Sequence, residues 1–168
     1  MNPLLWNSLY WLIERSYQMN LCCQKYVDKK RKLKRNVDWI LVAVPGIGSL
    51  LYIWEPIVTL ISSGLTALLA FFNNIVPLIV QAESELKELD GIAIKFAIIR
   101  TDAEELVMQY QDDKNFSESD LRERYLPLQK QLEELEIQSN SLIRKISHEE
   151  NEYLELETKK YLKKFHNE

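Results

Sequence analysis

Six polar residues lie inside a long apolar stretch of the sequence, where their side-chain amides and hydroxyls need hydrogen-bond partners. The stretch runs from Ile57 to Val80, has 24 residues and carries no charge. Its polar residues are Thr59, Ser62, Ser63, Thr66, Asn73 and Asn74. Most are three or four positions apart, so in a helix they share one face. Lipid leaves an Asn amide unpaired, which costs on the order of several kcal/mol.

This polar face therefore predicts contact with something other than lipid. One interpretation is interhelical hydrogen bonding, which Ser, Thr and Asn commonly provide in membrane bundles. The other is the uncharged wall of a water-filled pore made by several copies of the helix. The stripe alone favours neither. If the chain forms a pore, Asn73 and Asn74 are the candidates for its constriction, because they lie nearest the cytoplasmic end.

A cluster of basic residues directly before the apolar region is the second candidate site. Its members are Lys29, Lys30, Arg31, Lys32, Lys34 and Arg35. Lys and Arg within 15–20 residues of a membrane span mark its cytoplasmic side. With two spans, both termini would then be cytoplasmic. The same charges also suit contact with anionic lipid or with an anionic ligand such as nucleic acid.

The apolar region predicts two membrane-spanning helices, at about 38–54 and 57–80, joined by Glu55-Pro56. The first has only 16 charge-free residues, Trp39 to Trp54. At ~1.5 Å per residue they span about 24 Å, less than a hydrocarbon core of ~30 Å. This helix therefore needs its flanks to cross, and Pro45 predicts a kink in it. The alternative is a buried helical hairpin in a soluble protein.

Charge is distributed unevenly along the chain and divides it into three predicted regions. Residues 1–35 have eight Lys/Arg and two Asp/Glu, and their apolar spacing predicts an amphipathic, basic helix. That helix lies either in the headgroup layer or against another helix. Residues 36–80 form the transmembrane hairpin. Residues 81–168 have thirteen Lys/Arg and twenty-one Asp/Glu and form a cytoplasmic helical domain.

Within the last region, the second span is expected to continue as one helix to about Asp112. Ser117 and Ser119 are candidate caps for a final helix from about Asp120 to Lys164. Leucines and tyrosines follow a heptad spacing along it. The predicted fold class is thus all-α, a membrane protein with a two-helix transmembrane hairpin and long cytoplasmic helices packed as an antiparallel coiled-coil-like bundle.

No arrangement typical of a catalytic site is found in the sequence. The two histidines, His148 and His166, lie in or beside a polar helix, and Cys22 and Cys23 are adjacent and alone. Neither pair supplies a metal site. We therefore expect no enzyme activity, no metal and no cofactor.

The whole arrangement resembles the SLATT family of bacterial two-span effectors. The resemblance lies in the basic pre-membrane helix KYVDKKRKLKRN, the tight hairpin, and the tail segments KFAIIRTDAEELVMQYQDD and DLRERYLPLQKQLEELE. It covers most of the chain, without a diagnostic invariant motif. It implies an anti-phage effector that forms a pore in the inner membrane and depolarises it. The similar effector of the system called Hailong implies a tetramer controlled by DNA oligomers that a partner nucleotidyltransferase makes.

Two functions follow as hypotheses. The first is a homo-oligomeric channel of the bacterial inner membrane that is gated through its cytosolic helices by a nucleotide or oligonucleotide, with membrane lipid around it. The alternative is a membrane-anchored helical scaffold, or a holin-like protein, without gated conductance.

Overall fold

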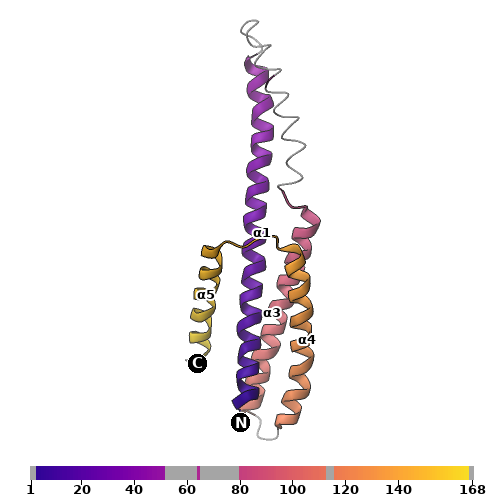
Figure 1. Ribbon diagram of the computed structural model, residues 1–168, viewed down its shortest axis with the longest axis vertical. Helices are drawn as coiled ribbons and strands as arrows, with labels where there is room; N and C mark the ends of the chain where they lie inside the picture. The colour runs from indigo at the N-terminus through magenta and orange to yellow at the C-terminus, as the bar shows by residue number, and fades with distance from the viewer. Residues whose placement is uncertain (1–2, 52–63, 65–79, 113–115, 167–168) are drawn as a thin grey trace. The chain divides into compact units, whose positions relative to one another are not determined.

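The computed structural model describes residues 3–51, 64, 80–112 and 116–166. Its elements there are α1 (Pro3–Leu51), α3 (Glu83–Asp112), α4 (Glu118–Leu142) and α5 (His148–His166) (Figure 1). The prediction of an all-α fold is confirmed for this part of the chain. The chain divides into two compact units, one formed by residues 1–26 with 87–168 and the other by residues 27–86.

The larger unit contains the first half of α1 with α4, α5 and most of α3. Elements that follow one another along the chain run in opposite directions (Figure 1). Apolar residues at helical spacing face inward, and those with almost no exposed surface are Leu9, Leu12, Ile13, Leu89, Phe96, Ile99, Leu121 and Leu132. Each such side chain contributes about 1.5–3 kcal/mol of burial. The apolar face of the N-terminal helix therefore packs against helices of its own chain.

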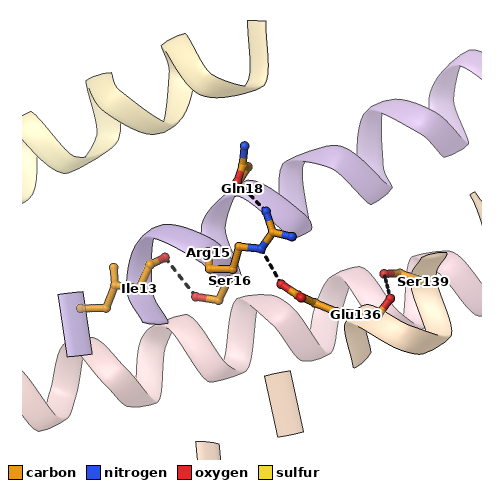
Figure 2. Close-up of polar contacts among 6 residues, drawn as sticks. All are labelled: Ile13, Arg15, Ser16, Gln18, Glu136 and Ser139. Carbon is orange, nitrogen blue, oxygen red and sulfur yellow. Dashed lines mark hydrogen bonds and ion pairs between the residues drawn. The ribbon is translucent and has the colours of Figure 1, made fainter. Parts of the chain in front are cut away.

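Polar contacts inside the larger unit connect α1 to its neighbours. Arg15 Nε lies 2.5 Å from Glu136 Oε1 on α4, and Arg15 also donates to Gln18 (Figure 2). The buried Asn20 donates to the carbonyl of Ala93 on α3 at 2.6 Å. Because a buried amide without a partner is costly, Asn20 fixes the position of α1 along α3.

The expected continuous helix from the second span to Asp112 is wrong at residues 80–82. These three residues are not helical, and α3 begins at Glu83. Two acidic residues, Glu83 and Glu85, lie in its first turn, where they interact favourably with the helix dipole. From there to Asp112 the helix is as predicted.

The expected single helix from Asp120 to Lys164 is also wrong, since residues 143–147 separate α4 from α5. Ser147 and Glu150 form a reciprocal pair of hydrogen bonds at the start of α5. The Ser147 N–H donates to Glu150 Oε2 at 2.8 Å, and the Glu150 N–H donates to Ser147 Oγ at 3.3 Å. This is a capping box, Ser-x-x-Glu, and it is visible in the sequence. The heptad seam ends with α4, and α5 instead buries Leu154, Thr158 and Leu162.

Of the two candidate caps at the start of α4, Ser117 is confirmed, whereas Ser119 lies inside the helix, which begins at Glu118. Ser117 accepts from the Asp120 backbone N–H, and the Asp120 carboxylate accepts from the Ser117 N–H at 3.0 Å. The Asp120 carboxylate also accepts from the Ser117 hydroxyl at 2.7 Å. This hydrogen bond, followed by the one from the Ser117 N–H, holds the pKa of Asp120 below its usual range.

Replacement of one core leucine should distinguish the buried from the exposed face of α4. Leu132 is fully buried and Ile137 is 72% exposed. We expect Leu132→Ala to lower the free energy of unfolding by about 2–5 kcal/mol and Ile137→Ala to change it by less than about 0.5 kcal/mol. Chemical denaturation of the full chain in mild detergent, followed by circular dichroism, checks this. Equal losses for both variants would contradict the packing.

The two cysteines predict a pH dependence of stability. Both are buried, and burial raises the pKa of Cys22 to about 11 and that of Cys23 to about 12. Raised thiol pKa values stabilise the folded state while the thiols are protonated, and this contribution is lost as the pH rises above about 9. Between pH 9 and 11 the free energy of unfolding of the native chain should fall by up to about 1.4 kcal/mol per pH unit for each thiol. The double variant Cys22→Ala with Cys23→Ala should lack this part of the decrease. Urea denaturation at each pH measures the free energy of unfolding. The same dependence on pH in the native chain and in the double variant would contradict this prediction.

Candidate functional site

The basic cluster and the first residue of α3 come together in the smaller unit. Arg31 and Lys34 are three positions apart, so they share one face of α1. Both reach Glu83, although 49 residues or more separate them from it along the chain. We call these three residues the ionic clamp. Glu83 was not among the residues that the sequence pointed to, because no local pattern links it to the basic cluster.

Each oxygen of the Glu83 carboxylate faces a different cation of the ionic clamp. Arg31 Nε and Nη2 lie 3.3 and 3.2 Å from Oε1. Lys34 Nζ lies 3.4 Å from Oε2. Burial acts to raise the pKa of Glu83, but the hydrogen bonds and charges of Lys34 and Arg31 outweigh it and hold that pKa below its usual range. Glu83 is therefore ionised at neutral pH.

The other predicted members of the cluster differ in exposure. Lys29, Lys32 and Arg35 are exposed, whereas Lys30 is half-buried like Arg31 and Lys34. The cluster therefore surrounds α1, as its spacing predicts, and only one of its faces turns toward α3. Chemically, the ionic clamp holds an anion between a guanidinium and an ammonium group.

The predicted pore-lining residues Thr59, Ser62, Ser63, Thr66, Asn73 and Asn74 lie outside the described residues. Most of the second predicted span and the last three residues of the first also lie outside them, whereas α1 remains helical past Pro45 to Leu51. Over the described ranges, no helix has both the length and the apolar character needed to cross a membrane.

A second polar cluster, which the sequence did not reveal, attaches α5 to the rest of the larger unit. The rings of Tyr17 on α1 and Tyr161 on α5 stack with centroids 4.1 Å apart. The Arg100 guanidinium lies 5.6 and 5.4 Å from the two ring centroids, within the range of a cation–π interaction. The Tyr161 hydroxyl donates to Glu104 on α3. Burial and then Glu104 raise the pKa of Tyr161, so this hydroxyl stays protonated.

A further contact on α5 has the same character, since the ammonium group of Lys25 lies 2.9 Å from the centroid of the Tyr153 ring. Between α4 and α5, the backbone N–H of Arg144 donates to the Tyr26 hydroxyl at 3.2 Å. The attachment of α5 thus combines aromatic and cationic contacts with the buried side chains of Leu154 and Leu162. In the part of the chain that is described, no group of three or more His, Cys, Asp or Glu residues could hold a metal ion.

Removal of one ring from this cluster should release α5 selectively. We expect Tyr161→Ala to raise amide hydrogen exchange across 148–166 by about tenfold or more and to leave 118–142 unchanged, because the change removes the ring stack with Tyr17 and the hydrogen bond to Glu104. Leu156→Ala, a change on the exposed face of the same helix, is the control and should change neither. Mass spectrometry of exchanged peptides measures both. Equal exchange in the two variants would contradict the attachment described here.

Comparison with known proteins adds no relative to this geometry. No family model, no curated protein and no solved structure matches the chain. The resemblance to the SLATT family thus stays a prediction from the layout of the sequence.

Proposed function

We propose that the chain is the subunit of a homo-oligomeric pore in the bacterial inner membrane, an effector that depolarises the membrane in response to a signal received by its cytosolic helices. In this proposal residues 38–54 and 57–80 form the transmembrane hairpin, and both termini are cytoplasmic. The polar face of the second span lines the pore. The signal is a nucleotide or oligonucleotide, as the SLATT resemblance implies.

The ionic clamp is the observation that supports the hairpin most directly. Arg31 and Lys34 come before the apolar region and Glu83 comes after it, yet they are in contact. A chain that enters and leaves a membrane at one place must cross it an even number of times. Two crossings of about 20 residues each account for the length between the two ends. The positive charge of the cluster favours the cytoplasm for that place.

The composition of the apolar region supports a second span that faces other helices or water and not only lipid, as the helices of a homo-oligomeric pore would. The stretch from Ile57 to Val80 is long enough to span and carries six polar residues without a charge. Two Asn residues are expensive in lipid and are unnecessary for an anchor. In a ring of identical helices they would give an uncharged, weakly selective pore wall.

Exposed isoleucines on the larger unit support association between copies of the chain. Ile94 and Ile98 lie one turn apart on α3, and Ile137 is on α4, with 63%, 53% and 72% of their surfaces exposed. Ile98 borders an open groove of about 370 Å³ between the two helices, with Lys95 and Glu134 beside it. A groove that carries one charge of each sign is suited to a second copy of itself, because each Lys95 would then have a Glu134 to pair with.

Single-channel recording tests the pore directly. Purified protein in planar bilayers should conduct, and Ser63→Leu with Asn73→Leu should abolish or strongly reduce the current by replacing polar wall with apolar side chains. Ile61→Leu with Ile75→Leu, on the opposite side of the predicted helix, should leave the current unchanged. A parent protein that never conducts, or currents that the first pair of changes leaves intact, would reject the pore and favour the scaffold.

The surface that carries the exposed Ile94, Ile98 and Ile137, here called the association surface, can be tested separately. Replacement of Ile94, Ile98 and Ile137 by Ser should lower the assembled fraction of detergent-solubilised protein severalfold, because the exposed apolar surface that drives association is removed. The control replaces three other exposed apolar residues, Met108, Leu126 and Leu156, in the same way. Light scattering after size exclusion gives the masses. Identical masses for both triple variants would contradict this surface.

A further inference from the structure

We propose that the ionic clamp is a binding site for the phosphodiester headgroup of an anionic lipid, and that Glu83 occupies the place of the phosphate when no lipid is bound. For the position of the headgroups, this inference rests on the membrane hairpin proposed above. It assigns to Glu83 a role that the basic cluster alone does not suggest, that of an internal competitor for Arg31 and Lys34.

The geometry of the ionic clamp is that of an anion site. Arg31 engages one carboxylate oxygen through two nitrogens, and Lys34 engages the other oxygen. A phosphodiester also has two unesterified oxygens that share one negative charge. It can therefore replace the carboxylate oxygen for oxygen, and guanidinium groups hold either kind of anion in the same manner.

Contacts in the ionic clamp are loose enough for such an exchange. Its N···O distances of 3.2–3.4 Å exceed the 2.7–2.9 Å typical of tight charge-assisted hydrogen bonds. Each of the three side chains is also 37–39% exposed. Water and small anions therefore reach them, and an exposed pair of this kind is held only weakly.

The position of the cations in the sequence favours a lipid over other phosphates. Lys34 precedes Trp39, where the charge-free segment begins, by five residues, which is about 7.5 Å along a helix. Arg31 precedes it by eight residues, about 12 Å. The headgroup layer is about 5–8 Å thick on each side of the core. Long basic side chains extend toward that layer, so both cations of the ionic clamp can reach lipid phosphates.

Exchange of Glu83 for a lipid would break the ionic link between α1 and the first turn of α3. The ionic clamp links the residues before the predicted hairpin to those after it, and Glu83 lies at the first position of α3. Anionic lipid would thus compete with the link between the second span and its cytosolic helix. The carboxylate released from the clamp would face an anionic surface, which repels it.

Lipid binding by the full chain in neutral detergent tests the proposal. The probe is phosphatidylglycerol with a fluorescent acyl chain, and the readout is the apparent Kd from anisotropy at low salt. Phosphatidylcholine with the same fluorophore controls for the headgroup. Glu83→Gln should tighten phosphatidylglycerol binding about two- to fivefold, since it removes the competitor. Glu88→Gln removes the same charge from an exposed position five residues further along α3 and should leave the Kd unchanged.

Two matched double variants locate the cations. Arg31→Gln with Lys34→Gln should weaken binding by about tenfold or more. Lys32→Gln with Arg35→Gln removes the same two charges from the adjacent, exposed face and should weaken it by no more than about threefold. Circular dichroism confirms that each variant keeps its helices.

Three results would overturn the proposal. The first is equal tightening by Glu83→Gln and Glu88→Gln, which would indicate a general effect of charge. The second is equal loss in the two double variants. The third is displacement of the probe by a single-stranded DNA hexamer that binds at least tenfold more tightly with the same dependence on Arg31 and Lys34, which would assign the site to nucleic acid. Because the assay needs no current, a chain that binds lipid as expected but does not conduct would retain this inference and lose the pore.

Discussion

Burial of one face of the first 26 residues is the interaction on which the larger unit depends. This part of α1 contributes three of the most buried side chains, Leu9, Leu12 and Ile13. It also contacts every other helix of the unit, with Asn20 bonded to α3, Arg15 to α4 and Tyr17 stacked on α5. Loss of that face would leave the other helices without a common partner. An amphipathic sequence that also suits a membrane surface is used here as the centre of a protein core.

Helix positions could be predicted largely from sequence because apolar periodicity reports burial. The spacing along α3 identified its buried face from Leu86 to Leu106, and Ser117 was recognised as a cap. Beyond Ser139 the heptad pattern predicted burial wrongly, since Tyr153 and Leu156 fit the period but are exposed. The capping box at Ser147 marked the break. Local hydrogen bonds at a helix start thus outweighed a periodicity that defects had already weakened.

The cations of the ionic clamp could be predicted from the sequence, but its carboxylate could not, for a related physical reason. Arg31 and Lys34 could be singled out because charges next to an apolar region are recognisable in one dimension. Glu83 could not, since its contact with them depends on how the chain returns after about fifty residues. The same holds for Arg100, Glu104 and Tyr161, whose cluster forms only because α5 folds back. Polar contacts between residues far apart in the chain produce no periodic pattern in the sequence.

The two-span hairpin is the central claim, and the side of the membrane reached by the Glu55-Pro56 turn tests it most directly. In a chain with Cys22→Ala and Cys23→Ala, a single cysteine is placed at Glu55 or at Lys114 and exposed to a membrane-impermeant maleimide from outside bacterial spheroplasts. The hairpin predicts that Glu55→Cys reacts in intact spheroplasts and Lys114→Cys only after lysis. Reaction of both positions only after lysis, with the protein absent from the membrane fraction, would contradict it.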